Sequence, residues 1–316
     1  MSTSTDLIKA GKKGLFFIIS FLCFTEWMSP SSALLVGIIF ALTLGSTFEE
    51  KSVSTAAGWL LKISVVGLGF GMNFFNAIEV GKYGLVITSI SITTSLVLGY
   101  YLGKKLKVDN KTTTLISSGT AICGGSAIAA IAPIIDANGR QITVALGIIF
   151  ILNSIALFIF PWIGELLQLS QTQFGYWSAI AIHDTSSVVG AATIYGNQAL
   201  EIATSVKLQR ALWILPLSLL ASFIYQSGKG KVTIPYFIFL FIVATLLNTF
   251  VPFISSQSVW IVSLAKKCLI LTLFLIGTSL SSDMIRNIGI RPMVKGVLLW
   301  IIIAIGSLFI IIHTSI

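Results

Sequence analysis

The sequence is poor in charged residues. Only 10% of its 316 residues are Asp, Glu, Lys or Arg, and 55% are hydrophobic, whereas a soluble domain carries about 25% charged residues. So few charges cannot cover the surface of a water-soluble globule of this size. The composition therefore excludes an ordinary soluble enzyme, a disordered chain and a nucleic-acid-binding protein, and it leaves a membrane protein.

Histidine and cysteine are also scarce. The chain has two histidines and three cysteines without a Cys-x-x-Cys pair, so neither a disulfide framework nor a metal site is expected. It contains no His-Glu-x-x-His zinc motif and no Gly-x-x-x-x-Gly-Lys-Ser/Thr loop for ATP. We therefore expect no cofactor, no bound metal, no catalytic residues and no enzyme activity.

What the sequence has instead is a series of apolar blocks. A membrane-spanning helix needs about 20 apolar residues, and the runs are continuous, which is not the alternation of a β-barrel. We predict an all-α polytopic membrane protein with about 10–11 transmembrane helices, the whole chain 1–316 forming a single transporter domain. The predicted spans are 14–28, 33–46, 55–75, 84–103, 113–134, 141–163, 174–197, 205–226, 232–254, 259–281 and 292–313.

The ends of the chain and its loops predict an orientation. The run from Gly14 to Met28 lacks a small-residue cleavage site and is expected to be an uncleaved first span, and whether the first two short blocks both cross is open. Basic residues collect in cytoplasmic loops, so we expect a bacterial inner-membrane protein with a cytoplasmic N-terminus. With alternating spans, the outside loops hold only Lys82 and Arg140, and the inside loops hold Lys9, Lys12, Lys13, Lys51, Lys104, Lys105, Lys107, Lys111, Lys229, Lys231, Arg286, Arg291 and Lys295.

Small polar residues interrupt the apolar block around Gly124 and Gly125. Each glycine costs a helix about 1 kcal/mol, and a break frees backbone groups that cannot face lipid. The amides of a helix that restarts there would attract an anion. The other possibility is close helix packing through small residues. We predict a broken helix whose substrate-binding residues are Thr120, Cys123, Gly124, Gly125 and Ser126.

A second interruption holds the titratable pair His183 and Asp184. Ionisable groups at membrane depth are usually functional, and histidine can carry a proton because it titrates at about pH 6.5. We predict that this pair couples ions and that Thr185, Ser186 and Ser187 contact substrate. The alternative is that Asp184 caps a half-helix that starts at Thr185.

The two interruptions share a layout. Ala121–Ser126 and Ala181–Ser186 are offset by 60 residues, and a second echo pairs Gly69–Gly81 with Gly277–Gly289. Repeated, interrupted apolar segments are typical of inverted-repeat transporters. We therefore predict two discontinuous helices related by an inverted repeat.

Lys207 and Arg210 lie three residues apart on one face of a predicted helix. Near the membrane surface they would snorkel, whereas deeper they would bind an anionic substrate, since the arginine fork donates paired hydrogen bonds. We include both in the substrate-binding set. Lys62 and the pair Lys266-Lys267 offer the same choice. Asn153 and Asn248 are expected to hydrogen-bond between helices.

Five segments resemble, in order, the motifs of a bacterial inner-membrane family whose members are labelled sulfate exporters: Gly119–Ala130, Ile182–Val189, Val206–Arg210, Ile276–Leu280 and Gly289–Pro292. The resemblance covers nearly the whole chain. It implies a relation to bile-acid/sodium symporters and cation/proton antiporters, which have a panel domain, a core domain and two discontinuous helices that cross at the bilayer middle. Ser187 and Gln209 depart from the family pattern, which has Gln and commonly Thr there.

We therefore expect a secondary active transporter that exports a small anion such as sulfate or a sulfonate, coupled to protons or sodium. Its expected partners are that inorganic or organic anion and the lipid bilayer, with a homodimer as a candidate assembly and no nucleic acid. Three alternatives stay open: a cation/proton antiporter that uses Asp184, a channel without proton coupling, and a membrane hydrolase with a Ser126–His183 dyad.

Overall fold

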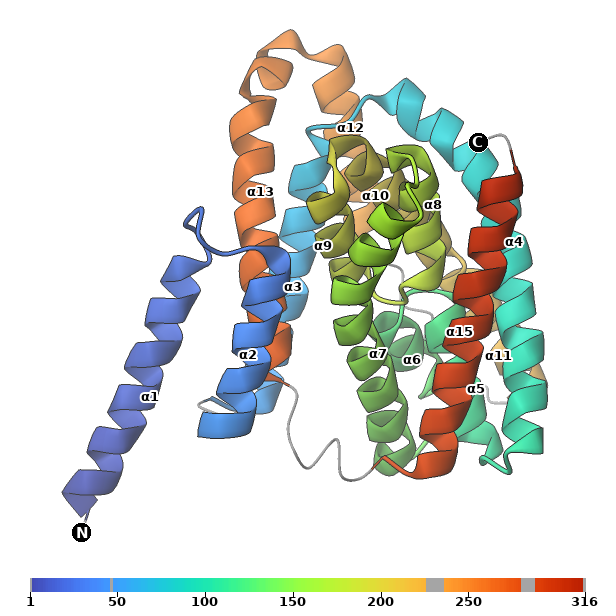
Figure 1. Cartoon of the computed structure of the whole chain (residues 1–316), viewed down its shortest axis with the longest axis horizontal. Helices are drawn as coiled ribbons and strands as arrows, with labels where there is room; N and C mark the ends of the chain where they lie inside the picture. Colours follow the sequence, from blue (N-terminus) through green and yellow to red (C-terminus); the bar gives the residue numbers. More distant parts are fainter. Residues whose placement is uncertain (1, 46–47, 226–235, 280–287, 315–316) are drawn as a thin grey trace. The chain divides into compact units, whose positions relative to one another are not determined.

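A computed structural model describes residues 2–45, 48–225, 236–279 and 288–314 (Figure 1). These residues form fourteen helices and no strand, which confirms the predicted all-α polytopic class. The loop residues Lys229, Lys231 and Arg286 and most of the echo at Gly277–Gly289 lie outside the described ranges. Six described helical stretches are long and apolar enough to cross a membrane: Ser52–Gly69, Gly84–Lys105, Gly139–Leu166, Asn197–Tyr225, Pro252–Thr278 and Ile290–His313.

The described helices form two compact units. Unit 1 contains α1 (Ser2–Leu22), α2 (Pro30–Leu44), α3 (Glu50–Gly69), most of α12 (Tyr236–Phe250) and α13 (Pro252–Thr278). Unit 2 contains α4 (Phe74–Lys105), α5 (Asn110–Ala121), α6 (Gly125–Ile131), α7 (Gly139–Leu166), α8 (Gln171–Ala181), α9 (Thr185–Tyr195), α10 (Asn197–Leu212), α11 (Ile214–Tyr225) and α15 (Ile290–His313). That the two act as a single transporter domain stays a prediction.

Unit 1 is packed around α13, which lies against both α2 and α3. Small residues bring α2 and α13 into backbone contact, because a Cβ atom on Gly277 would lie 2.9 Å from the Cα of Gly37. Close approach through small residues is a common way to pack membrane helices. Phe16, Phe40 and Phe274 fill the neighbouring space between α1, α2 and α13.

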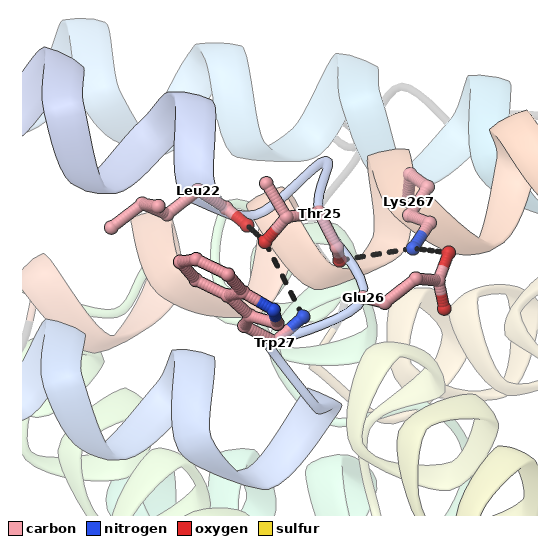
Figure 2. Close-up of polar contacts among 5 residues, drawn as sticks. All are labelled: Leu22, Thr25, Glu26, Trp27 and Lys267. Atoms are coloured by element: carbon pink, nitrogen blue, oxygen red, sulfur yellow. Dashed lines mark hydrogen bonds and ion pairs between the residues drawn. The ribbon is translucent and has the colours of Figure 1, made fainter.

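The turn after α1 is tied to α13 by Lys267 (Figure 2). The Lys267 ammonium donates to the carbonyl of Thr25 over 2.9 Å and pairs with the Glu26 carboxylate at 2.6 Å. The Thr25 hydroxyl donates to the carbonyl of Leu22 at the end of α1. Glu26 is 91% exposed, so Lys267 has the contacts of a snorkelling lysine that reaches a polar turn. Asn248 of α12 donates to the carbonyl of Met72 in the turn between α3 and α4, so its hydrogen bond runs from a helix to a turn and not between two helices as predicted.

Unit 2 is built on the long helices α4, α7 and α15, with α10 and α11 forming one further bent span. The bend lies at Trp213, between α10 and α11. Pro216 explains it, because proline has no N–H with which to bond the carbonyl of Leu212 four residues earlier. The remaining elements, α5–α6 and α8–α9, are the two segments that the sequence predicts to be interrupted.

Candidate functional site

The first predicted interruption lies between two half-helices. Helix α5 ends at Ala121 and α6 begins at Gly125, which confirms the break that the glycine pair predicts. Gly124 turns the chain with φ of +64°, a conformation that favours glycine because a Cβ atom is crowded there. Its N–H bonds back to the carbonyl of Gly119 over 2.9 Å, so the turn also closes the end of α5.

The second interruption has the same form. Helix α8 ends at Ala181 and α9 begins at Thr185. The carboxylate of Asp184 caps α9, accepting bonds from the backbone N–H of Ser186 at 3.0 Å and of Ser187 at 3.4 Å, and from the Ser186 hydroxyl. The alternative interpretation, that Asp184 caps a half-helix starting at Thr185, is therefore confirmed. The role of Asp184 in ion coupling stays a prediction.

The half-helices α5 and α6 turn back to the end of unit 2 from which they came. At that end the amide of Gln141, in the first turn of α7, donates to the carboxylate of Asp109 over 2.9 Å. Lys111 at the start of α5 donates to the carbonyl of Asp136, beyond the end of α6, over 2.5 Å. The pair is thus a re-entrant hairpin, called hairpin 1 below.

The half-helices α8 and α9 form a second re-entrant hairpin, hairpin 2, at the opposite end of α7. The rings of Phe174 near its start and Tyr195 at its end stack at 3.8 Å between centroids. Gln198, just after hairpin 2, donates to the hydroxyl of Thr172 over 3.3 Å. Figure 1 shows α5 and α6 in the lower half of unit 2 and α8 and α9 in its upper half.

These hairpins correct two predicted crossings. The spans 113–134 and 174–197 each enter and leave at one end of unit 2, so Arg140 lies at the same end as Lys111 and not opposite it. The physical reason is length. A half-helix of 12 residues is about 18 Å long, which reaches only the middle of an apolar layer about 30 Å thick.

The tips of the two hairpins meet. A Cβ atom on Gly124 would lie 3.5 Å from both the Cα and the Cβ of Asp184. The breaks fall at residues 122–124 and 182–184, which is the offset of 60 seen in the sequence. Helices α4 and α7, which precede the hairpins, run in opposite directions (Figure 1). The order of long helix and hairpin is therefore repeated with inverted direction.

Asn153 of α7 holds the tip of hairpin 2. Its side-chain oxygen accepts from the backbone N–H of His183 at 3.0 Å and of Asp184 at 3.3 Å. These two amides belong to the residues that leave the helical pattern, so neither has a carbonyl four residues back in an intact helix. Asn153 therefore bonds as predicted to another element, but its partners lie in the break between α8 and α9 and not in a helix.

Arg210 of α10 ties both hairpins together. Its side chain is fully buried, and the guanidinium spreads its donors over the C-terminal ends of α5 and α8. The acceptors are the carbonyls of Ala121 at 2.6 Å, Thr120 at 3.1 Å, Ala179 at 3.2 Å and Ile180, with the Ser91 hydroxyl at 3.5 Å.

Lys207, one turn earlier and also fully buried, completes this set. Its ammonium donates to the carbonyls of Ile182 at 2.6 Å and Ala179 at 3.3 Å, and the indole of Trp300 donates to the carbonyl of Ala181 at 3.0 Å. Every carbonyl from Ala179 to Ile182 therefore has a partner, as the end of a buried helix requires. Direct contact of Lys207 and Arg210 with substrate stays a prediction, because the donors described above serve the hairpins.

Burial divides the predicted site residues. Ser126 is exposed, and Gly125 and Asp184 are half-buried. The others are buried: Thr120, Cys123, Gly124, His183, Thr185, Ser186, Ser187, Lys207 and Arg210. The accessible polar groups at the tips are thus the Ser126 hydroxyl and the Asp184 carboxylate, with the two cations enclosed behind them.

Several buried polar atoms near the tips have no hydrogen-bond partner among the described residues. Both ring nitrogens of His183 are in this state, as are the side-chain nitrogen of Asn153 and the hydroxyls of Ser118 and Thr120. Buried polar groups normally have a partner in protein, water or ligand. The interior beside the tips is therefore polar enough to bind water or a small polar ligand.

The charges at the tips sum to a positive value. Two helix C-termini and two N-termini contribute about −0.5 and +0.5 each and cancel. With Lys207 and Arg210 protonated and Asp184 ionised, the formal side-chain charges at the tips sum to +1. A potential of this sign favours a small anion over a cation.

The sequence predicts an inside-loop position for Lys295, although the predicted span 292–313 also contains this residue. Lys295 is the sixth residue of α15 and is fully buried. It donates to the carbonyl of Thr113 at 3.0 Å and to the hydroxyl of Ser117 at 2.7 Å. Pro292 was the available signal, because proline is typical of the first turn of a helix and so puts Lys295 beyond that turn.

Comparisons with known proteins found a matching family model and relatives that are named membrane proteins. A family described as Conserved hypothetical protein 698 matches residues 15–296. The chain is 50% identical to a UPF0324 membrane protein of Bacteroides thetaiotaomicron, covering 93% of this chain and 89% of the relative. It is 49% identical to a UPF0324 membrane protein of Porphyromonas gingivalis, covering 90% of this chain and 87% of the relative. No solved structure matches.

Proposed function

Because the chain belongs to the family described as Conserved hypothetical protein 698, whose relatives are named membrane proteins, we propose that it is a secondary active transporter of a small anion. The candidate anions are sulfate and sulfonates, and the coupling ion is a proton or sodium. The observation that carries the proposal is the meeting of two opposed re-entrant hairpins beside two buried cations.

The proposed site lies at the hairpin tips. The anion contacts the Ser126 hydroxyl and the backbone at Gly124 and Gly125, while Lys207 and Arg210 act on it through their positive potential. His183 and Asp184 take part in coupling. Interrupted helices with their ends at the membrane midplane are typical sites in inverted-repeat transporters, and the Ser126 side chain is exposed at the tip of hairpin 1.

The proposed location is the bacterial inner membrane, with the N-terminus in the cytoplasm. Hairpin 1 returns to the end of unit 2 that carries Lys104, Lys105, Lys107, Lys111 and Arg140, and α15 begins at that end with Arg291. Because basic residues concentrate on the cytoplasmic side, this end supports the assignment. We propose that the chain shares its transport mechanism with sulfate exporters, bile-acid/sodium symporters and cation/proton antiporters.

The test uses purified protein in liposomes that contain a pH-sensitive dye. Sulfate, sulfite, taurine, sodium and potassium salts are added in turn. We expect an internal pH change that depends on the anion and is lost in Asp184→Asn, whose amide oxygen still caps α9. Ser154→Ala is the matched control, because Ser154 lies next to Asn153 on α7 and bonds only to the carbonyl of Phe150. Current with added anion but no pH change would favour a channel and contradict the proposal.

A cation/proton antiporter that uses Asp184 is the second candidate. It is favoured by one observation, that Asp184 is the accessible charged group at the tips while Lys207 and Arg210 are enclosed. In the same assay it predicts a response to sodium or potassium that Asp184→Asn abolishes and Ser126→Ala leaves intact. The hydrolase alternative has weaker support, since neither ring nitrogen of His183 has a hydrogen-bond partner among the described residues.

A further inference from the structure

Lys295 is a buried lysine with a hydrogen-bond set that suits its neutral form. The side chain is fully buried in unit 2, and its nitrogen has two acceptors, the carbonyl of Thr113 and the hydroxyl of Ser117. An ammonium has three N–H donors, whereas the amine formed by loss of one proton has two. Within the described residues the site therefore provides one acceptor for each donor of the amine.

The helix ends around Lys295 differ from those around Lys207 and Arg210. The latter two lie at the C-terminal ends of α5 and α8, where the helix dipole favours a positive charge. Lys295 is the sixth residue of α15, and Thr113 is the fourth residue of α5. Both positions lie beyond the first turn and away from a helix C-terminus, so the helix dipoles give a cation no support there. The helix ends near Lys295 therefore stabilise a positive charge far less than the helix ends near Lys207 and Arg210 do.

No described acidic side chain pairs with Lys295. Asp109, the N-cap of α5, accepts from the backbone N–H of Thr112 and from the Gln141 amide. The other charged or titratable groups at this end of the helices packed around Lys295 are Tyr100, Tyr101, Lys104 and Lys105 on α4, Lys111 on α5, Tyr225 on α11, Arg140 on α7 and Arg291 on α15. Lys111 bonds to Asp136 and Tyr225 to Thr114, and most of the rest are exposed.

A surface hollow of about 290 Å³ lies close to Lys295 along two helices. Pro292 and Thr112 line it, together with Asp109 and Arg140. Pro292 precedes Lys295 by three residues, and Thr112 is next to the acceptor Thr113. The hollow therefore begins about one helical turn, or about 5 Å along the axis, from the lysine.

We propose that Lys295 binds and releases a proton during transport, and that the proton exchanges with water through this hollow. The ammonium loses one proton to water and becomes an amine that keeps both of its hydrogen bonds, and the reverse step reloads it. The proposal rests on the proposed transport function and names the proton as its coupling ion. It adds a protonation site on α15, which holds hairpin 1 through Thr113 and Ser117.

The first test measures protonation without any substrate. Full-length protein with ¹³C at the lysine Cε position is placed in nanodiscs and titrated by NMR, with Lys295→Arg used to identify the resonance. We expect the resonance that is missing in this variant to titrate at a clearly lower pH than the exposed lysines, which titrate at about pH 10.4. A Lys295 resonance that moves only with the exposed lysines would overturn the proposal. Lys111→Arg is the matched control.

The second test measures coupling with sulfate as the probe. Arginine stays charged at all working pH values, so Lys295→Arg should lose sulfate-driven proton movement but keep sulfate–sulfate exchange. Lys295→Met should also lose sulfate-driven proton movement and keep sulfate–sulfate exchange. It replaces Lys295→Arg in the test if that variant does not fold. Proton movement that survives in both variants would contradict the role of Lys295. If the wild type carries no sulfate, the transport proposal fails for this anion, and the NMR titration still decides whether Lys295 exchanges its proton.

Discussion

Gly124 is the residue on which the geometry of the tips depends most directly. Its φ of +64° lies in the left-handed region, and a side chain there would also meet the Cγ2 methyl of Ile149 at 3.1 Å. Gly125, the next residue, has helical geometry, and a Cβ atom on it would have only ordinary contacts of 3.4 Å or more. Adding a methyl group should therefore change the free energy of unfolding much more at Gly124 than at Gly125.

We predict that Gly124→Ala lowers the free energy of unfolding by about 2 kcal/mol, because an L-residue in this backbone region costs about 1–2 kcal/mol and the methyl group adds crowding. Gly125→Ala should leave stability unchanged or raise it slightly, since alanine favours a helix over glycine. The measurement is the thermal unfolding midpoint of the two purified variants in the same detergent. Equal midpoints for both variants would show that the tip does not need glycine at position 124.

Some of these residues could be assigned from the sequence and others could not. The density of small residues predicted the turn at Gly124, and the Asp-Thr-Ser sequence predicted a cap at Asp184, because both depend on local chemistry. The same reasoning could not show that Arg210 bonds to carbonyls of two different hairpins. Those partners are 31 and 89 residues away along the chain, and no local pattern encodes such a pairing.

One helix, α10, contacts both hairpins at the C-terminal ends of their first half-helices. Arg210 contacts the C-terminal ends of both α5 and α8, and Lys207 contacts α8 and the residue that follows it. Arginine supplies five N–H donors in a planar fork, which a lysine ammonium with three donors cannot reproduce. The attachment of hairpin 1 should therefore depend on arginine itself and not only on a positive charge.

We predict that Arg210→Lys destabilises the protein by about 3 kcal/mol, because it leaves two or more buried carbonyls without a donor. Both hairpins should loosen together. The measurement is hydrogen exchange followed by mass spectrometry, with faster exchange expected in peptides that cover the ends of α5 and α8. Arg291→Lys, at an exposed position on α15, is the control that should change nothing. Faster exchange in α8 alone would mean that Arg210 does not hold hairpin 1.

At the scale of elements, the sequence predicted where the helices break but not where they go after the break. Composition locates the interruption, since small and polar residues mark it. A half-helix that continues across the membrane and one that turns back have the same composition. The bonds from Asn153 to the tip of hairpin 2 help to decide between them, and their partners lie about 30 residues away along the chain.

For the whole molecule, the hairpins change which loops share a side of the membrane. If hairpin 1 crossed the membrane, Arg140 would lie opposite the basic cluster that contains Lys105. With a re-entrant hairpin, both lie at one end of unit 2, and Gln198 lies at the other. This arrangement also strengthens the charge asymmetry, since it moves one of the two predicted outside cations to the basic side.

We predict that single cysteines at Lys105 and Arg140 react from the same side of the membrane. Both side chains are exposed, as is that of Gln198. Each substitution is made in a variant whose three native cysteines are replaced by alanine, so that only the introduced cysteine reacts with the label. An impermeant maleimide should label Lys105→Cys and Arg140→Cys in inverted vesicles, and Gln198→Cys in intact cells. This pattern follows because cytoplasmic loops carry the basic residues. Labelling of Arg140→Cys in intact cells together with Gln198→Cys would instead require that hairpin 1 crosses the membrane, and the meeting of two opposed hairpins would then not be the basis of transport.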